Sequence, residues 1–467
     1  MSDFKAYRNI AVIDIGKTNA KVVVLDARTG AEIAVVKTNN SVLKTAPYPH
    51  YDIERLWGFI IEALKSFAAA PGFDAISITT HGASAVLLDA QGGLALPVLD
   101  YEHSYPQAVQ EAYAQLRPAF AETFSPELSG GLNVGAQLHY QKNTFPEDFA
   151  RVATILTYPQ YWAFCLTGIA TNEVTSLGCH TDLWNPTAGA YSSLVDTLGI
   201  RELMAPVRSA FDALGPVLPA LAAEIGLVAP VPVYCGIHDS NASLLPHLVD
   251  NDAPFAVVST GTWVISFAVG GDLDHLDPER DVLANVDAYG RAVPSSRFMG
   301  GREFEILAAK IGTAPSDAIA GALERVIEKN FMLLPNVVAG SGPFPGSKMR
   351  WIGEASMDTA ERLAAVSLYL ALMTEACLGL IGAKGPVFVE GPFATNGAYL
   401  IALAALTGAE VIALPGSTGT SQGAALLTGI RPHTTMASAP VRAELPGLTN
   451  YREAWREALS CGGQPIR

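Results

Sequence analysis

The chain has 467 residues, of which 49% are hydrophobic and 16% are charged. This length is about three times that of a typical domain, and the hydrophobic fraction excludes a disordered or fibrous protein. The formal net charge of −15, from 30 basic and 45 acidic residues, disfavours nucleic acid or an anionic membrane as the main partner, because phosphate polymers are bound by clustered Lys and Arg. We expect a globular protein of two domains.

Cysteine usage and the start of the chain indicate a cytoplasmic protein. The five cysteines are scattered and include no Cys-x-x-Cys pair, so we interpret them as reduced thiols. Polar residues 1–9 lead directly into a strand-like segment with Asp14, without the apolar stretch of a signal peptide. The longest apolar region, residues 363–381, includes Ser367 and Glu375, which favours a helix in a large core over a membrane span.

Strand-like and helix-like segments alternate along the chain, a pattern typical of α/β domains. In chain order we predict a strand at 10–15, a strand at 21–25, a helix at 56–69 and a strand at 75–79. Then follow a strand at 231–235, a helix at 242–248, a strand at 254–259, a helix at 360–381, and strands at 387–389 and 411–414. Residues 337–349 are rich in Gly, Pro and Ser and predict a long surface loop.

Two apolar strands end in a Gly/Thr turn and are each followed at once by another apolar strand. The first turn is Gly16-Lys-Thr18 and the second is Gly261-Thr262, half a chain later. Either the likeness is a coincidence between two strand–turn–strand segments, or the chain contains a duplicated domain whose two turns face each other across a cleft.

The first turn matches a P-loop only in part. A P-loop has a glycine five residues before its Gly-Lys-Thr and a helix after it, but Ala11 occupies that position and a strand follows. The P-loop interpretation is therefore rejected. Small and hydroxylated turn residues can still offer N–H and hydroxyl groups to phosphate oxygens, so phosphate binding by this turn stays open.

The segment Gly419-Thr-Ser421-Gln-Gly423 has the spacing of a hydrolase nucleophile elbow. A hydrolase of that class needs an acid and then a histidine after the serine. The only later histidine is His433, and no Asp or Glu lies between it and Ser421. We interpret the segment as a small-residue turn that lets a helix approach another segment, or a nucleotide, closely.

Histidine spacing indicates no structural zinc site, because the nine histidines are dispersed. Magnesium needs only one or two carboxylates beside phosphates and water. Asp14, at the end of the first predicted strand, is the best candidate. The alternative is a turn-forming aspartate bonded to backbone N–H groups nearby.

Asp239 follows an apolar strand in Gly236-Ile-His238-Asp239 and opens a helix-like run. At a helix N-terminus the dipole favours an ionised carboxylate. Asp239 is therefore either a helix N-cap or the general base that a sugar hydroxyl requires.

Four motifs occur in one order, and together they resemble the FGGY family of carbohydrate kinases over nearly the whole chain. They are Asp14-Ile-Gly-Lys-Thr18, Gly236-Ile-His-Asp239, Ser259-Thr-Gly-Thr-Trp263 and Glu390-Gly-Pro-Phe-Ala-Thr-Asn396. The resemblance implies an α/β protein with two related domains of the actin/Hsp70/hexokinase (ribonuclease H-like) ATPase fold and an interdomain cleft. Residues 1–248 would carry the sugar side, the first phosphate hairpin and the catalytic aspartate, and residues 249–467 the nucleotide side.

The resemblance also implies roles for single residues, with ATP and Mg²⁺ as cofactors and a small sugar as the substrate. Asp239 would be the catalytic base and Asp14 the residue that contacts Mg²⁺. Nucleotide and phosphate binding would fall to Gly16, Thr18, Asn19, Thr260, Gly261, Thr262, Gly391, Asn396 and Gly423, with Ala424 beside the last. Sugar binding would fall to His81, Gly82, Asp100, His238 and Asp239.

Some features resemble the rhamnulose and fuculose kinases in particular, so a ketose is the expected substrate. These features are the Ser-Thr-Gly-Thr-Trp string, the His238–Asp239 pair and Gln137-Leu-His-Tyr. The literal Phe-Gly-Gly-Tyr string is absent, and Pro392 stands where many members have a second glycine. A catalytically silent sugar- or nucleotide-sensing protein of the same fold is the alternative function. The oligomeric state stays open, with a homodimer among the states allowed.

Overall fold

We describe the protein from a computed structural model that covers residues 7–416, 419–432 and 439–461. The chain forms two compact units. Unit 1 contains residues 1–250, 284–292 and 418–435, and unit 2 contains residues 251–283, 293–417 and 436–467. The predicted division between residues 248 and 249 falls inside α10 (Asp239–Asp250), and a single boundary does not describe the two later segments of unit 1.

The main sheet of unit 1 has the strand order β11-β12-β6-β1-β2-β3, with β13 also paired to β6. β1 (Asn9–Ile15) is antiparallel to β2 (Asn19–Asp26) and parallel to β6 (Ala75–Thr80). The other strands of unit 1 are β3 (Glu32–Asn39), β4 (Val42–Leu43), β5 (His50–Tyr51), β7 (Ala85–Asp89), β8 (Val152–Thr157), β9 (Trp184–Asn185), β10 (Ala190–Tyr191), β11 (Ala213–Pro216), β12 (Pro232–Tyr234) and β13 (Ile237–His238).

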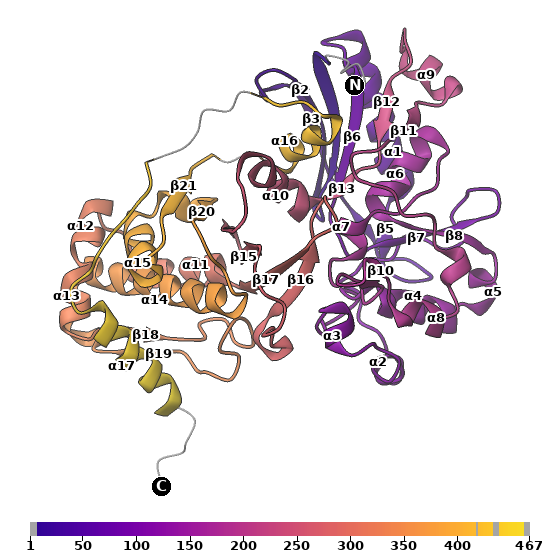
Figure 1. Ribbon diagram of the computed structural model, residues 1–467. Helices are drawn as coiled ribbons and strands as arrows, with labels where there is room; N and C mark the ends of the chain where they lie inside the picture. Colours follow the sequence, from indigo (N-terminus) through magenta and orange to yellow (C-terminus); the bar gives the residue numbers. More distant parts are fainter. Residues whose placement is uncertain (1–6, 417–418, 433–438, 462–467) are drawn as a thin grey trace. The chain divides into compact units, whose positions relative to one another are not determined.

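Helices cover both faces of this sheet, as Figure 1 shows with α1 and α6 on one face and α10 and α16 on the other. Ala11, Ile13 and Ile15 of β1 pack into the core formed with α1 and α6. Ile10 and Val12 pack into the core formed with α10 and α16. Since side chains alternate along a strand, Asp14 shares a face with Ile10 and Val12, and this alternation directs its carboxylate toward α16.

Unit 1 contains eleven of the α-helices assigned in the described residues. They are α1 (Ile53–Ala69), α2 (Gln107–Ala114), α3 (Phe120–Thr123), α4 (Val134–Thr144), α5 (Pro146–Phe149), α6 (Tyr158–Thr167), α7 (Val174–Leu177), α8 (Ser193–Thr197), α9 (Pro219–Ile225), α10 and α16 (Thr420–Ala425). The aspartate at position 52 begins α1, because its side chain accepts the N–H of Arg55.

The second sheet repeats the arrangement around the first hairpin. Its strand order is β16-β17-β15-β14-β20-β21, with β14 (Phe255–Thr260) antiparallel to β15 (Val264–Val269) and parallel to β20 (Val387–Glu390). Each central strand therefore pairs with its own hairpin partner on one side and with a later parallel strand on the other. The interpretation of the two turns as a duplicated domain feature is confirmed, and coincidence is rejected.

The other strands of this part of the chain are β16 (Val282–Val286), β17 (Ala292–Phe298), β18 (Met332–Leu334), β19 (Arg350–Ile352) and β21 (Val411–Leu414). The helices of unit 2 are α11 (Gly300–Ile311), α12 (Ser316–Gly321), α13 (Leu323–Glu328), α14 (Thr359–Leu380), α15 (Gly397–Thr407) and α17 (Leu448–Cys461). Every helix and strand predicted from the sequence is present, with ends shifted by a few residues.

The long helix α14 lies in the core of unit 2, beside α15 in Figure 1. A capping box between Asp358 and Glu361 fixes its start. Among the described residues it is the one helix long and apolar enough to cross a membrane, and 78% of its apolar window is buried within the protein. The prediction of a core helix at this position is confirmed.

The segment 337–349 has no helix or strand, as predicted, but it does not lie wholly on the surface. Ser341, Gly342 and Pro343 are buried. The N–H of Gly342 donates to Asp281 Oδ2 at 2.7 Å, and a Cβ at this positive-φ glycine would come within 2.7 Å of Phe298. This hydrogen bond and this close approach hold the middle of the loop inward, which its polar composition did not indicate.

Candidate active site

Asp14 lies near the end of β1 and is held by side chains from distant parts of the sequence. Its Oδ2 accepts hydrogen bonds from the hydroxyls of Thr420 and Ser421, the second at 2.7 Å. Lys21 Nζ lies 3.5 Å from the same oxygen. The side chain is 9% exposed. These partners belong to α16 and β2 rather than to the backbone of the adjacent turn, so the turn-forming alternative does not account for this aspartate.

The first turn is fixed by backbone hydrogen bonds. Gly16 N–H donates to the carbonyl of Asn19 at 2.9 Å, and the side chain of Asn40 donates to the carbonyl of Gly16 at 2.8 Å. Thr18 and Asn19 are exposed. A cavity of about 440 Å³ is lined by Asp14, Gly16, Asn19, Ala20, Lys21, Lys37 and Thr420. The structure thus brings the predicted metal residue and two predicted phosphate residues to one cavity.

This cavity fits a magnesium ion that arrives with phosphates. Among the described residues, no group of three or more His, Cys, Asp or Glu could hold a metal by itself. Of the described residues that line this cavity, Asp14 is the only carboxylate, and Lys21 and Lys37 supply positive charge. Mg²⁺ usually takes one or two protein carboxylates and completes its octahedron with phosphate oxygens and water.

α16 approaches α10 closely because of a glycine. A Cβ at Gly423 would lie 1.7 Å from the carbonyl oxygen of Ala242, and Ser77 Oγ donates to the carbonyl of Ala424 at 2.6 Å. The close helix approach that the small-residue turn predicted is confirmed. The nucleotide contact of Gly423 stays a prediction, and His433 lies outside the described residues.

Asp239 is the first residue of α10, directly after β13. Its Oδ1 accepts the N–H of Ser240 at 2.7 Å and lies 3.1 Å from His238 Nε2. The side chain is 29% exposed. Desolvation by the surrounding protein, together with the nearby charge of Asp14, raises the pKa of Asp239 to about 7. A carboxylate that is accessible and titrates near neutrality is suited to accept a proton from a hydroxyl.

His238 lies behind Asp239 as a neutral hydrogen-bond donor. Burial lowers the pKa of its imidazole to about 4, so the ring is uncharged near neutral pH. The amide nitrogen of Asn241 lies 3.5 Å from Nδ1, which assigns the ring proton to Nε2, where it points to Asp239. A Cβ at Gly82 would lie 2.7 Å from Nε2, so glycine there leaves room for the ring.

Two further residues support this pair and were missed in the sequence. Thr175 Oγ1 accepts the backbone N–H of His238 at 3.0 Å and donates to Glu173 Oε2. Glu173 is fully buried, and burial raises its carboxyl pKa to about 7. The sequence offers no signal for this contact, because residues 173–175 and residue 238 are far apart along the chain.

The predicted sugar residues His81 and Asp100 lie in an aromatic cluster. The His81 ring centroid is 5.0 Å from Tyr51 and 5.6 Å from Tyr101. Lys17 forms ion pairs with Asp100 and Glu102 and lies over the Tyr101 ring at 4.7 Å. Tyr51 was missed because β5, a strand of two residues, carries no pattern in the sequence.

In unit 2 the second phosphate turn, residues 260–262, and the motif at residues 390–396 are adjacent. The hydroxyl of Thr260 donates to the carbonyl of Glu390 and accepts the N–H of Phe393 at 3.0 Å. A Cβ at Gly391 would lie 1.9 Å from the carbonyl oxygen of Thr260, at φ +76°. The Thr260 hydroxyl is occupied by these two bonds. Gly261 and Thr262 are the exposed residues of the turn.

Asn396 is the N-cap of α15. Its Oδ1 accepts the N–H of Tyr399 at 3.1 Å, and its amide donates to Ser367 Oγ at 3.2 Å. The side chain is half-buried. The structure therefore assigns Asn396 a capping bond, and its contact with a nucleoside stays a prediction.

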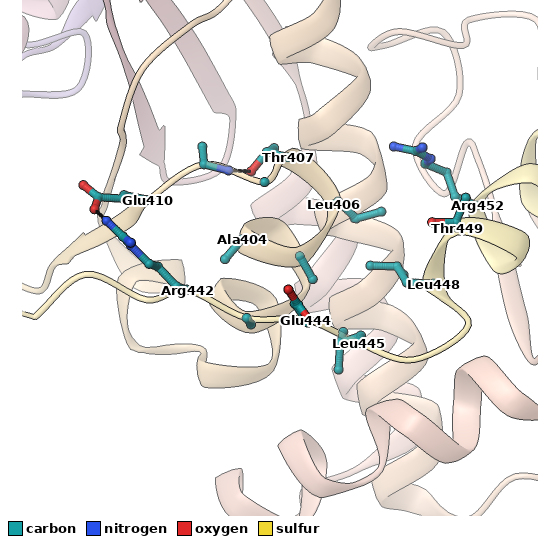
Figure 2. Close-up of a pocket in the computed structure, with 14 residues that line it drawn as sticks. Ala404, Leu406, Thr407, Glu410, Arg442, Glu444, Leu445, Leu448, Thr449 and Arg452 are labelled. Atoms are coloured by element: carbon teal, nitrogen blue, oxygen red, sulfur yellow. Dashed lines mark hydrogen bonds and ion pairs between the residues drawn. The ribbon is translucent and has the colours of Figure 1, made fainter.

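A cavity of about 900 Å³, larger than the one at Asp14, belongs to unit 2 and contains none of the predicted site residues. Figure 2 shows it between the end of α15 and residues 442–452, with Glu410 paired to Arg442 at one side. Cavity size is therefore a poor guide to the chemistry of this protein. The titratable side chains of Asp14, His238 and Asp239 in unit 1 are a better guide.

Known proteins that are similar to this chain are carbohydrate kinases. A carbohydrate kinase from Novosphingobium aromaticivorans has a similar structure, with a TM-score of 0.90, 37% identity and coverage of 96% of this chain and 100% of that chain. A probable L-xylulose kinase of Pasteurella multocida is 27% identical over 60% of this chain and 59% of its own length. The L-xylulose/3-keto-L-gulonate kinase of Escherichia coli (strain K12) is 25% identical over 62% and 58%. The matched part spans less than two thirds of these two curated relatives.

Family matches cover most of the chain. Residues 9–246 match the N-terminal domain of the FGGY family of carbohydrate kinases, and residues 252–437 match a C-terminal domain described as carbohydrate kinase FGGY. Both matches follow the order of the four motifs that suggested the resemblance. The chain belongs to the FGGY family of carbohydrate kinases.

Proposed function

We propose that the protein is an ATP-dependent kinase that transfers the γ-phosphoryl group to a hydroxyl of a ketose, with Asp239 as the general base. The observation that carries the proposal is the environment of Asp239. This accessible carboxylate lies beside the neutral ring of His238, and the pKa of Asp239 is raised to about 7. L-Fuculose, L-rhamnulose and a ketopentose such as L-xylulose are the candidate acceptors.

Asp239 would take the proton from the attacking hydroxyl. The sugar oxygen forms a bond to the γ-phosphorus while the bond from that phosphorus to the oxygen of the departing diphosphate breaks. His238 Nε2 donates to Asp239 Oδ1, so one carboxylate oxygen is held and the other is available to the hydroxyl. This role is typically worth ~10²–10⁴-fold in rate.

Asp14 and the two turns would bind the phosphate groups and help to neutralise their charge. Mg²⁺, when bound through Asp14, supplies neutralisation of the negative charge on the phosphates. Thr420 and Ser421 orient the Asp14 carboxylate through their hydroxyls. The exposed turn residues Thr18 and Thr262 offer hydroxyl donors to phosphate oxygens.

The test is an ADP-release assay over ketopentoses, 6-deoxyketohexoses, ketotetroses and polyols, run beside the Asp239→Asn variant. Asparagine caps helices about as well as aspartate but cannot accept the proton. We expect sugar-dependent ADP release from the wild type and a loss of ~10²–10⁴-fold in the variant, with melting temperature and ATP affinity unchanged. If the variant keeps more than about a tenth of the wild-type rate, Asp239 is not the general base. If the wild type releases no sugar-dependent ADP with any acceptor, the catalytically silent sensor is favoured.

A further inference from the structure

The strand β3 forms one edge of the main sheet of unit 1, at the other end from β11 (Figure 1). Its inner side pairs with β2, and no strand of the described residues pairs with its outer side. Ile33, Val35 and Val36 are 45%, 43% and 38% exposed, so three of the nine large hydrophobic side chains that are exposed among the described residues belong to this strand. An unpaired edge that carries apolar side chains is a place where another strand can add.

The direction of the backbone groups of β3 follows from its ladder with β2. The N–H of Asn40 donates to the carbonyl of the residue before β2 at 2.8 Å, directly beyond the last pair of the ladder. In an antiparallel ladder, residues that bond to the neighbouring strand alternate with residues whose N–H and C=O point away from it. The groups of Val35, Lys37 and Asn39 therefore point outward. Arg55 donates to the outer carbonyl of Asn39, but within the described residues the outer groups of Val35 and Lys37 have no partner.

A bulge in β3 places two opposite charges on one face of the strand. Lys37 and Val35 lie opposite alternate residues of β2, and after a shift of register Glu32 lies opposite the next of these alternate residues, Leu25. Alternate residues of a strand point to the same face. Lys37, Val35 and Glu32 therefore share a face, with the valine in the middle. Without the bulge, residue 33 would take the place of Glu32.

This arrangement is complementary to itself under a two-fold axis. When a second copy of β3 lies antiparallel with Val35 opposite its own equivalent, Lys37 of each copy lies opposite Glu32 of the other. Opposite charges that face each other across antiparallel strands are stabilising, and like charges are destabilising. The two-fold axis forms each ion pair twice. An axis at Lys37 or at Glu32 would instead bring like charges together, so the charges select the axis at Val35.

The same face of the sheet carries the cavity at Asp14. Asp14 lies opposite Lys21 in the ladder of β1 with β2, and Lys21 lies opposite Lys37 in the ladder of β2 with β3. All three line the cavity. Lys21 Nζ lies 3.5 Å from Asp14 Oδ2 and 3.6 Å from Glu32 Oε1. Lys37 is exposed and forms no ion pair within the described residues, so a carboxylate from a second copy can pair with it.

We propose that unit 1 pairs with a second copy of this chain through β3, about a two-fold axis at Val35, and that Glu32 of the second copy then lies beside the cavity at Asp14. The main sheets of the two copies become one continuous sheet. Glu32 of the second copy neutralises Lys37, and a phosphate ligand of the cavity would use the same positive charge. Pairing and phosphate binding therefore oppose each other. This coupling rests on the proposed kinase function, whereas the pairing does not.

Sedimentation velocity of the full chain over a series of concentrations tests the pairing. We expect a reversible equilibrium between monomer and dimer. Val35→Lys places like charges opposite each other at the axis and should raise the Kd of the dimer at least ~10-fold. Val228→Lys is the matched control, because Val228 is a fully exposed valine of unit 1 outside β3, and it should leave this Kd unchanged. A monomer at every concentration, or the same Kd for both variants, would overturn the proposal.

An exchange of charges tests the register. Glu32→Lys and Lys37→Glu each bring like charges together at two places in the dimer, so each should raise the Kd about tenfold. The double variant, with both substitutions, again has opposite charges across the axis and should return the Kd to within about threefold of the wild type. Thermal melting of each variant shows whether it is folded. A folded double variant that dimerises no better than the single variants would contradict the axis at Val35.

MgATP tests the coupling to the cavity. It should raise the Kd of the wild-type dimer about fivefold, as expected for competition over one screened charge, and it should have no such effect on Lys37→Gln. If calorimetry shows that MgATP binds but the Kd of the wild-type dimer does not change, the coupling is wrong, while the pairing and the kinase function stand. If MgATP does not bind at all, the proposed function is contradicted and the coupling with it, and the variants of Val35 and Glu32 still decide on the pairing.

Discussion

The two hairpins share one topology but carry different chemistry. Asp14 is the second-last residue of β1 and pairs with Lys21 across its hairpin, while Ser259 is the second-last residue of β14 and pairs with Ile265. The first hairpin ends at the charged Lys21 of β2 and at hydroxyl groups of α16. The second ends in glycine contacts, where Gly391 and Gly301 lie against the backbone of residues 260 and 261.

This difference shows that a repeated fold divides its roles through few side chains. The first hairpin supplies the carboxylate and its orienting hydroxyls, so changes there should affect chemistry. The second supplies a closely packed backbone whose shape depends on the lack of a Cβ, so changes there should affect stability. Variants in either hairpin, or in the residues that support it, therefore test this division of roles when each is compared with a matched position.

The largest effect is expected from Asp14→Asn beside Ser259→Ala. Asparagine keeps the shape at position 14 but loses the charge, and kcat should fall by ~10²–10³-fold, as when a charge-stabilising group is removed. Ser259→Ala at the equivalent position should stay within about threefold, as for a group without a role in charge stabilisation. Steady-state kinetics at saturating ATP measure both, and equal losses would show that the hairpins do not divide their roles.

Glycine substitutions should affect the second hairpin more than the first, the reverse of the order expected for kcat. Gly391→Ala places a Cβ 1.9 Å from a carbonyl oxygen, whereas Gly16→Ala meets its nearest atom at 3.2 Å. We expect a loss of about 2–4 kcal/mol in unfolding free energy for Gly391→Ala and less than about 1 kcal/mol for Gly16→Ala. Urea unfolding measures the difference. Similar stability of the two variants would mean that the second hairpin tolerates displacement.

Thr175→Val tests the support behind Asp239. The variant keeps the side-chain shape but leaves the N–H of His238 without its acceptor, so kcat should fall by ~10–100-fold through misplacement of the base. The KM for ATP should not change. Thr175→Ser restores the hydroxyl and should restore most of kcat. If kcat is low in Thr175→Ser but stays near the wild-type value in Thr175→Val, the hydrogen bond to His238 is not the cause.

The smallest effect is a shift in the pH profile. Because the pKa of Asp239 is raised to about 7, its proton-accepting form is lost as pH falls through that value, and kcat/KM should fall about tenfold per pH unit below it. Glu173 also titrates near 7. Asp14 contributes to the raised pKa of Asp239, so in Asp14→Asn the residual activity should decline at lower pH. An unmoved profile would assign the titration to another group.

Local sequence patterns predicted the strand ends but not their long-range partners. Alternation of apolar residues located β1, and the Gly/Thr turns located both hairpins, because these patterns extend over a few residues. Neither Thr420 and Ser421 beside Asp14 nor Thr175 beside His238 follows from such patterns, since each contact joins segments far apart in the chain.

Side-chain roles were also less predictable than positions. His238 was expected to bind sugar, and the structure adds a bond from it to Asp239. The segment of Gly423 was expected to let a helix approach another segment or a nucleotide closely, and the structure identifies the segment as the backbone of α10. In both cases the residue type was informative, but the neighbour that uses it comes from the tertiary fold.

The return of α16 to unit 1 bears on the order in which the protein is made. A ribosome releases β1, β6 and α10 long before it reaches residue 420, yet Ala424, Ala425 and Leu427 complete the core on that face of the sheet. Until then this core lacks the side chains of α16, and Asp14 has neither of its hydroxyl partners. Unit 1 therefore reaches its final packing only after the α16 segment has been synthesised.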